Sequence, residues 1–431
     1  MKHSETQNRL IYSYIATIGI FFYLYYAIYK MLLFHLSLLG RDYAYTYIAI
    51  QNFFNGSSLY VMPHGHPPLL YAPFSVLIYL PLNFFSLNQA IILWFILTQA
   101  LILFCACILY KIGSQINKTH SAVAAIIAIC FSMPLFGIIF SGNTSIVMLA
   151  GFCIVYYSIA LEREKTVPFV LALLAYFKIF PTSFILVYVR HQAWREIFYL
   201  VGFLVLLGLL SLCIFGMEEH ILYLNQLPKG LKYLSPTIYN ASFAFVLNLF
   251  FPQFNSLAIT IVTAIWGIIL LVLWWFVADR HISHVKSASQ LADALIVLVF
   301  IFLVFPASST MSNAFLMIPF YFIIFLRLQN NCQFHHFFSF ILLFCLINFW
   351  EIIIYQLPIP GSGSTIKAIA QNSREHPILY PMLYSLPFLF NLVFYAWLLV
   401  NYRTISLAIY QMFQRKKGAH ISIEIPSSAS A

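Results

Sequence analysis

The sequence predicts an all-α fold, a polytopic bundle of transmembrane helices, and its composition leads to this class. Hydrophobic residues make up 62% of the 431 positions and charged residues only 8%, whereas soluble proteins carry about 25% charged residues. A chain this apolar cannot cover a water-exposed surface, and it is also the opposite of a disordered chain. Apolar runs of roughly 20 residues, the length that crosses a bilayer core, recur along it. We expect about twelve crossings, counting two half-helices.

The first apolar run extends from Ile11 to about Leu39 and follows a polar start that contains Lys2 and Arg9. Basic residues favour the cytoplasmic side of a membrane, which places the N-terminus there. The run is longer than the apolar region of a signal peptide, and no small-residue cleavage site follows it. We therefore interpret it as an uncleaved first helix.

A polar loop, residues 40–68, and a proline-broken apolar segment, residues 69–87, follow the first helix. If residues 69–87 span the membrane, every later basic loop faces outward. If they lie along the interface, the basic loops fall on the cytoplasmic side. Because cytoplasmic loops are enriched in Lys and Arg, the charge distribution favours an interfacial or re-entrant segment. Residues 40–68 are then extracytoplasmic.

Lys178 and Pro181 interrupt the apolar run at residues 167–189. A charged side chain in the middle of a bilayer is costly unless it is solvated or paired, so we expect two half-helices that meet near Lys178 at the outer side. A second outer loop is expected at residues 217–240. The other helices are expected near residues 89–110, 121–140, 144–161, 196–216, 256–277, 291–305, 314–328, 337–355 and 381–402.

Asp42 and Lys178 fall on the outer side in this topology and are the first candidates for chemistry. The Asp42 carboxylate can remove the proton of an acceptor hydroxyl; the alternative is a solvated loop residue paired with Arg41. Lys178 can neutralise a phosphate at membrane depth; the alternative is a side chain that snorkels to the interface. The net charge of +10 comes from Lys and Arg between apolar runs, which indicates topology rather than nucleic-acid binding.

Further residues of the outer side can bind a sugar, a phosphate or the acceptor: His66, Tyr71, Asn143, Lys229, Lys232 and Asn240. The alternatives are an interfacial histidine at position 66, a helix cap at Asn143 and an ordinary loop at residues 229–240. His64 and His66 together with Asp42 offer metal-binding groups, but their spacing matches no closed site. We therefore predict neither a metal nor another cofactor.

Four stretches occur in a characteristic order: RDYAYTYIAIQNFFNGSSLY after the first helix, HPPLLYAPFSVLIYLPL, SGNTS at a helix start, and LALLAYFKIFPTSFILVYV followed by AWRE. In this order the chain resembles the C-type (GT-C) integral membrane glycosyltransferases. It is most similar to glycosyltransferase family 87, which contains polyprenyl-phosphate-mannose-dependent alpha-mannosyltransferases. The resemblance covers residues 11–250. We therefore divide the chain into a catalytic module at residues 1–250, variable helices at residues 251–405 and a cytoplasmic basic tail at residues 406–431.

The resemblance implies an inverting transfer of a sugar from a lipid phosphate, with Asp42 as the base. The motifs of the family fall on Gly142, Asn143 and Ser145, on Lys178 and Pro181, and on His66, Pro67 and Pro68, with His66 in place of the usual aromatic residue. A later stretch at residues 306–313 reads PASSTMSN and lacks the Trp and His of the family pattern. That departure leaves the sugar and the acceptor open.

We predict an integral membrane glycosyltransferase that moves a sugar, mannose or a related hexose or pentose, from a polyprenyl-phosphate donor to a lipid or glycan acceptor. The site faces the outside of a bacterial plasma (inner) membrane, and both termini are cytoplasmic. The sequence contains no Gly-rich nucleotide fingerprint, which fits a lipid-linked donor. The alternative is a transporter or flippase without transferase chemistry, which predicts charges buried along a pathway and repeat symmetry. A lipid-linked polysaccharide polymerase or ligase would not need Asp42.

Overall fold

The structure is a computed structural model, and every element in the part of the chain that it describes is helical. It describes residues 17–25, 40–61, 71–163, 165–234, 242–251, 253–279, 286–305, 310–329, 337–356 and 379–416, together with the single residues 14, 69 and 334.

α12 (Lys286–Val304) is the central helix of the bundle. In its most apolar stretch 83% of the residues are buried, against 28% in α3 (Leu87–Ser114), 17% in α9 (Trp194–Leu234) and 22% in α11 (Ser256–Asp279). The exposed side chains of these three outer helices are mostly large and apolar, as they are where a helix faces lipid. The predicted all-α membrane bundle is therefore confirmed.

Five described helices are long and apolar enough to cross a membrane: α3, α9, α11, α12 and α16 (Leu379–Val400). A sixth span results if α4 (Lys118–Cys130) and α5 (Met133–Ser141) are counted together. The predicted total of about twelve crossings is not confirmed. That total included apolar segments that form shorter helices in the structure, among them α6 (Ser145–Ala160), α7 (Thr166–Ala175) and α13 (Met317–Leu328).

The bend between α4 and α5 replaces the single helix that the sequence predicts at residues 121–140. The two helices meet at an angle of 58°. Ser132 lies in an extended conformation between them, and Pro134 stands in the first turn of α5, where the missing N–H of proline is not needed. The bend directs the end of α5, at Gly142, toward α2 (Arg41–Phe54).

Two segments that were expected as loops contain helices. The outer loop at residues 40–68 begins with α2, and the loop expected at residues 217–240 is helical as far as Leu234, as a continuation of α9 beyond Gly216. The polar residues at positions 218–220 suggested a loop, but the apolar residues on either side of them, Met217, Ile221 and Leu224, recur at helical spacing. Helical periodicity is the stronger signal in such a stretch.

Residues 73–84 form two short 3-10 segments, η1 (Pro73–Ile78) and η2 (Leu80–Phe84). A 3-10 helix rises about 2 Å per residue, so neither segment alone can cross a bilayer core of about 30 Å. The Tyr47 hydroxyl donates a hydrogen bond to the Phe85 carbonyl at 2.8 Å, which fixes the end of η2 against α2.

The break expected at Lys178 is present, because α7 ends at Ala175 and Lys178 stands outside any helix. The elements that follow along the chain are η3 (Phe180–Phe184), α8 (Ile185–Arg190), α10 (Phe243–Phe250), η4 (Thr310–Leu316), α14 (Phe337–Gln356) and α17 (Tyr402–Lys416).

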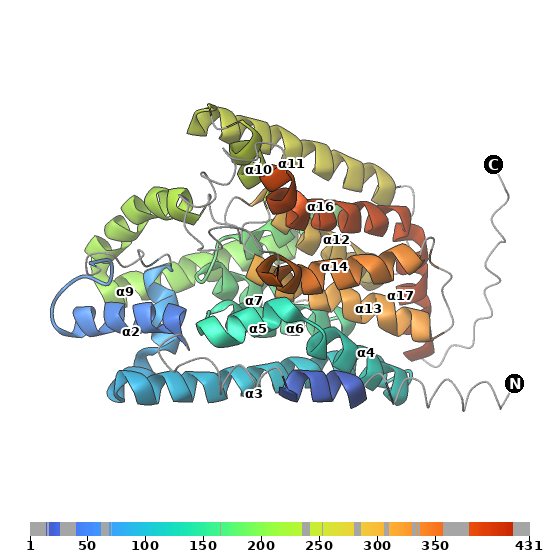
Figure 1. Ribbon diagram of the computed structural model, residues 1–431, viewed down its shortest axis with the longest axis horizontal. Helices are drawn as coiled ribbons and strands as arrows, with labels where there is room; N and C mark the ends of the chain where they lie inside the picture. Colours follow the sequence, from blue (N-terminus) through green and yellow to red (C-terminus); the bar gives the residue numbers. More distant parts are fainter. Residues whose placement is uncertain are drawn as a thin grey trace, which may run out of the picture.

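The bundle has two distinct ends, marked by α2 and α17. Figure 1 shows α2 at one end and α17 lying across the other; we call these the α2 end and the α17 end. The sequence predicts a tail from residue 406, but α17 packs on α12 and α13. It buries Ile409 and Phe413 there.

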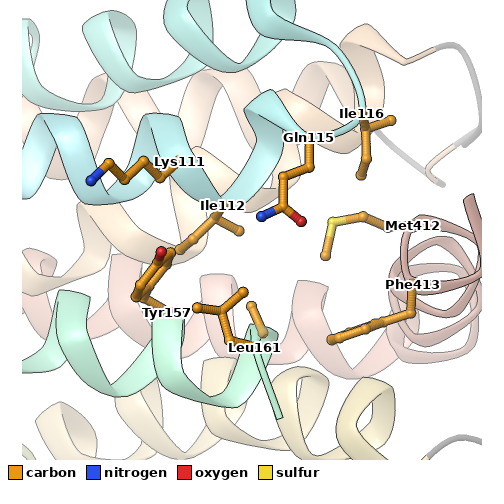
Figure 2. Close-up of a pocket in the computed structure, with 9 residues that line it drawn as sticks. Lys111, Ile112, Gln115, Ile116, Tyr157, Leu161, Met412 and Phe413 are labelled. Atoms are coloured by element: carbon orange, nitrogen blue, oxygen red, sulfur yellow. The ribbon is translucent and has the colours of Figure 1, made fainter. Parts of the chain in front are cut away.

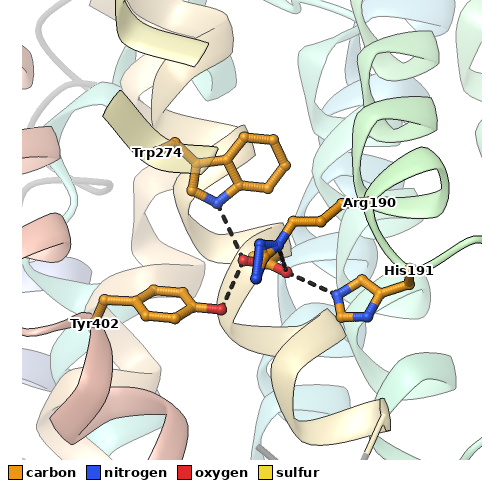
Figure 3. Close-up of polar contacts among 5 residues, drawn as sticks. Arg190, His191, Trp274 and Tyr402 are labelled. Atoms are coloured by element: carbon orange, nitrogen blue, oxygen red, sulfur yellow. Dashed lines mark hydrogen bonds and ion pairs between the residues drawn. The ribbon is translucent and has the colours of Figure 1, made fainter. Parts of the chain in front are cut away.

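Asp293, two turns into α12, holds together several helices at the α17 end. Its carboxylate is fully buried. Oδ2 contacts Arg190 Nε at 3.2 Å and His191 Nε2 at 2.7 Å, and Oδ1 accepts hydrogen bonds from Trp274 Nε1 at 3.0 Å and from the Tyr402 hydroxyl at 2.8 Å. Figure 3 shows these four side chains converging from the α8–α9 turn, α11 and α17. The network joins the end of α8 to α11, α12 and α17.

Candidate functional site

Asp42 stands in the first turn of α2, at the point where α2 meets the end of α5. Gly40 precedes α2 with φ 73°, and Gly142 follows α5 with φ 68°. The Gly40 N–H donates to the Phe140 carbonyl at 2.8 Å, and the Trp94 indole N–H donates to the Gly142 carbonyl at 2.9 Å. The left-handed conformation, which glycine adopts without strain, allows the two backbones to touch.

Asp42 and Lys178 are joined by a continuous chain of hydrogen bonds. Asn143 donates from Nδ2 to Asp42 Oδ2 at 2.8 Å. Its Oδ1 accepts from the Ser145 hydroxyl at 2.7 Å and from the Ser145 N–H at 2.9 Å. Lys178 Nζ donates to Ser145 Oγ at 3.4 Å, and the Asp42 carboxylate lies within electrostatic range of the Lys178 ammonium. The structure therefore brings three of the predicted site residues into one cluster.

The two sequence alternatives for Asp42 and Asn143 can be compared with these contacts. Among the described residues Asp42 forms no ion pair with Arg41, and its partner is Asn143. Asn143 does act locally on the start of α6, as a cap would, because Oδ1 accepts from the Ser145 N–H. Asn143 therefore both caps the start of α6 through Oδ1 and binds Asp42 through Nδ2.

Tyr71 lies beside the same cluster. Burial and, secondarily, the Asp42 carboxylate raise the pKa of the Tyr71 phenol. The backbone of Tyr71 is fixed by Tyr60, whose hydroxyl donates a hydrogen bond to the Tyr71 carbonyl at 2.8 Å. The phenol is therefore a neutral hydroxyl group next to the Asp42 carboxylate.

Two further tyrosines were not recognised in the sequence: Tyr79, which lies near Asp42, and Tyr43, whose ring packs beside that of Tyr79. Their rings pack on Trp94, with centroids 5.5 Å and 4.7 Å away. Both hydroxyl groups are buried and have no hydrogen-bond partner among the described residues, and Tyr79 lies within electrostatic range of Asp42. With 28 tyrosines in the chain, no sequence signal distinguishes these two from lipid-facing ones.

The other predicted site residues are not brought into the cluster by the structure as described. His66 and Asn240 lie outside the described residues, and so does His64. Lys229 and Lys232 lie on the final turns of α9, but their side chains are also outside the described part. Within the described ranges there is no group of three or more His, Cys, Asp or Glu side chains that could hold a metal ion.

A small cavity lies away from this cluster, at the α17 end. It has a volume of about 10 Å³ and is lined by residues of α3, α6 and α17, among them Lys111, Tyr157 and Phe413 (Figure 2). A cavity of this size holds about one water molecule, so it cannot accept a sugar or a lipid chain.

The glycine contact that positions the site predicts a specific sensitivity to Gly142→Ala. A Cβ at Gly142 would lie 2.9 Å from Gly40 Cα and 3.0 Å from Tyr43 Cβ, and the residue would keep a positive φ. We expect the added methyl group to push α2 away from Asn143 and to lower activity at least about tenfold, since small displacements of reacting groups are that costly. Gly56→Ala is the matched control: Gly56 has φ 79° and nothing within 4 Å of the added Cβ. Equal loss of activity in the two variants, measured as initial rates, would contradict the role of the contact.

Comparison with known protein families identifies the chain. The sequence profile of glycosyltransferase family 87 matches residues 69–306, more than half of the 431 residues. The matched stretch contains Asn143 and Lys178, while Asp42 precedes it. No curated protein is found to match the chain. From the matched stretch and the bundle of apolar helices we conclude that the chain belongs to glycosyltransferase family 87 and is a membrane glycosyltransferase.

Proposed function

We propose that this enzyme transfers a sugar, mannose or a related hexose or pentose, from a polyprenyl-phosphate donor to a hydroxyl group of a lipid or glycan acceptor. The observation that carries the proposal is the hydrogen-bond chain from Asp42 through Asn143 and Ser145 to Lys178. It places a carboxylate and a cation in one cluster, as an inverting displacement at a sugar phosphate requires.

Asp42 acts as the general base in this proposal. Asn143 occupies Oδ2, which leaves Oδ1 to accept the proton of the acceptor hydroxyl. As that proton moves to Asp42, the acceptor oxygen forms a bond to the anomeric carbon from the face opposite the phosphate. The bond between the anomeric carbon and the phosphate oxygen breaks, and its electron pair leaves with the lipid phosphate. General-base catalysis of this kind typically contributes about 10²–10⁴-fold to the rate.

Lys178 stabilises the departing phosphate in this proposal. A Lys ammonium is a strong point-charge partner for phosphate, and a well-placed cation stabilises a developing charge by a few kcal/mol. Lys178 is half-buried, with the Ser145 hydroxyl as its one protein partner within hydrogen-bonding distance among the described residues. Its other N–H donors are therefore available to a phosphate. Lys229 and Lys232 are proposed as additional phosphate contacts.

The tyrosines beside Asp42 are proposed to contact the acceptor, together with His66 and Asn240. The phenols of Tyr71 and Tyr79 lie within electrostatic range of the Asp42 carboxylate, and the buried Tyr43 hydroxyl lies near that of Tyr79. Buried hydroxyls without partners are costly, by roughly 1–3 kcal/mol each, and a substrate hydroxyl or a water that it orients would remove that cost. This arrangement favours a hydroxyl-bearing acceptor at the Asp42 side.

We further propose that the α2 end faces the outside of a bacterial plasma membrane and that both termini are cytoplasmic. Lys111, Arg403 and Arg415 are exposed on helices that end at the α17 end or lie across it, and Arg163 is exposed just after the end of α6 there. Positive residues favour the cytoplasmic side. A transporter, the alternative from sequence, would expect Asp42 and Lys178 to be spread along a pathway, and their joint hydrogen-bond chain counts against it.

The donor is tested with the purified enzyme in lipid nanodiscs, offered polyprenyl-phosphate mannose, glucose, galactose and arabinose one at a time with membrane-extracted acceptor. We expect transfer from one of these donors and none from the corresponding nucleotide sugars. Transfer from a nucleotide sugar alone would overturn the proposed donor class. No transfer from any donor by folded protein would favour the transporter instead.

Lys178→Met tests the phosphate contact. Because the substitution removes the cation but keeps the length of the side chain, we expect the KM for the lipid-phosphate donor to rise at least about tenfold, and kcat to fall with it. Lys111→Met is the control, since it removes an exposed lysine at the α17 end. Initial rates over a donor titration separate the two parameters. An unchanged donor KM in Lys178→Met would remove Lys178 from the proposed phosphate site.

A further inference from the structure

α9 turns sharply at Gly216, after it has completed one full crossing. Residues 194–215 form roughly 33 Å of helix at 1.5 Å per residue, slightly more than the bilayer core of about 30 Å. Gly216 has φ 76° and ψ 169°, outside the helical region. The His220 ring spans the turn, with Nδ1 2.7 Å from the Gly216 carbonyl and Nε2 2.8 Å from Ser211 Oγ. The helix that follows therefore begins at the level of the lipid headgroups.

We call residues 217–234 the distal segment of α9, and one face of this segment is fixed to the protein. Glu219 is only 7% exposed. Its Oε2 accepts a hydrogen bond from the Ser58 hydroxyl at 3.0 Å and from the Leu59 N–H at 3.2 Å. The rings of Tyr223 and Tyr60 lie 6.0 Å apart, one turn further along. These contacts determine the rotation of the segment about its own axis, and Figure 1 shows it folding away from the bundle at the α2 end.

A second face of the distal segment is apolar and exposed. Met217, Ile221 and Leu224 are 62%, 51% and 61% exposed. Their spacing of four and three residues places them on one stripe of the helix. The exposed residues Glu218 and Asn225, seven positions apart, form a polar strip along one flank of that stripe. The segment thus has three faces, which carry protein contacts, apolar side chains and polar side chains.

We propose that the distal segment of α9 lies in the membrane interface, with Met217, Ile221 and Leu224 inserted among the lipid acyl chains and Glu218 and Asn225 in the headgroup water. The partner is the lipid of the leaflet at the α2 end. A helix that begins at headgroup level and carries an exposed apolar stripe beside a polar strip has the features of an interfacial helix.

The contacts of the distal segment with the protein link the lipid surface to the cluster around Asp42. Glu219 binds residues 58 and 59, and the adjacent Tyr60 donates its hydroxyl hydrogen to the carbonyl of Tyr71. Tyr71 is the residue whose phenol lies near Asp42. The interfacial helix is therefore connected to the acceptor side of the site by three short steps. The proposed position of the distal segment in the membrane interface does not depend on which donor or acceptor the enzyme uses.

The test is a depth scan of single cysteines, at positions 217, 218, 221, 224 and 225, in an otherwise labelling-free background. Cys107, Cys213, Cys332 and Cys345 are replaced by alanine, because the first, second and fourth are exposed and Cys332 lies outside the described residues. Each variant is labelled with bimane and reconstituted into vesicles, and thermal unfolding verifies that it is folded. Quenching by lipids brominated on the acyl chain is then compared with quenching by aqueous iodide.

We expect brominated lipid to quench the labels at 217, 221 and 224 at least about twofold more than those at 218 and 225, and iodide to show the reverse order. Positions 218 and 225 are the matched controls, since they lie on the same helix and are equally accessible to the label. Equal quenching at all five positions, or iodide quenching that is strongest at 221, would overturn the proposal. Disulfide-linked dimers formed through Ile221→Cys would also overturn it, because the stripe would then be covered by a second copy of the chain.

Discussion

Asp42→Asn is expected to lower the rate of sugar transfer by at least about 10³-fold while leaving the fold intact, since general-base contributions reach about 10⁴-fold. The amide has the same shape as the carboxylate and can still accept the hydrogen bond from Asn143 Nδ2 through its oxygen. It cannot take a proton from an attacking hydroxyl. The measurement is the initial rate with saturating donor and acceptor, together with the unfolding temperature of the purified variant.

Glu218→Gln is the control for Asp42→Asn. It removes a carboxylate that is exposed at the same end of the bundle, so general electrostatic effects on an anionic donor change in the same direction. We expect its transfer rate to stay within about twofold of the native rate, as surface charges have small effects. Near-native turnover in Asp42→Asn would show that another group removes the proton, whatever the control does.

Asp293→Ala is expected to destabilise the protein by about 3–5 kcal/mol, the cost of breaking a buried ion pair by removing one partner. The substitution leaves the Arg190 guanidinium, 5% exposed, without its carboxylate. It also removes the acceptor of the Trp274 and Tyr402 hydrogen bonds. The measurement is chemical or thermal unfolding of the protein in a mild detergent, followed by the fraction of protein that remains monodisperse.

Tyr402→Phe provides a graded control in the same network. It deletes one neutral donor and leaves the carboxylate paired with Arg190 and His191. Its expected cost is only about 1 kcal/mol, the net value of one ordinary hydrogen bond. If Asp293→Ala were no more destabilising than Tyr402→Phe, the carboxylate would not be what holds α8 to α11, α12 and α17.

The sequence allowed the helical membrane bundle and the break at Lys178 to be predicted, because both depend on local properties. Low charge and repeated apolar runs are sufficient for the fold class, and a Lys followed by a Pro cannot continue an apolar helix at low cost. The grouping of Asp42, Asn143 and Lys178 at one end followed from counting crossings and from the resemblance. The contacts that join them were beyond prediction, because they depend on how the ends of α2 and α5 meet.

Asp293 shows a different limit of sequence reasoning. It is the third residue of the apolar run expected at residues 291–305 and looks like the polar edge of a helix, but it is fully buried. The signal that could have identified it is that ionisable residues within membrane helices usually have a partner. Its partners at positions 190, 191 and 402 are separated from it by about a hundred residues in either direction. Only tertiary structure reveals such a pairing.

The extension of α9 was missed because Glu218, Glu219 and His220 were taken as loop residues. Each of the three has its own environment on a helix: Glu218 is exposed, Glu219 binds the segment after α2, and His220 closes the turn at Gly216. A cluster of polar residues is therefore not sufficient evidence of a loop when apolar residues recur at helical spacing within it.

The contact between Gly40 and Gly142 has an evolutionary consequence. A Cβ at Gly142 would fall 2.9 Å from Gly40 Cα, and Gly40 itself has the Ile91 side chain 3.0 Å from where its own Cβ would lie. A larger residue at position 142 therefore demands a shift of the backbone at Gly40, and a larger residue at position 40 demands a smaller side chain at position 91. In an alignment of homologues, the column of Gly142 should therefore covary with that of Gly40, and the column of Gly40 with that of Ile91.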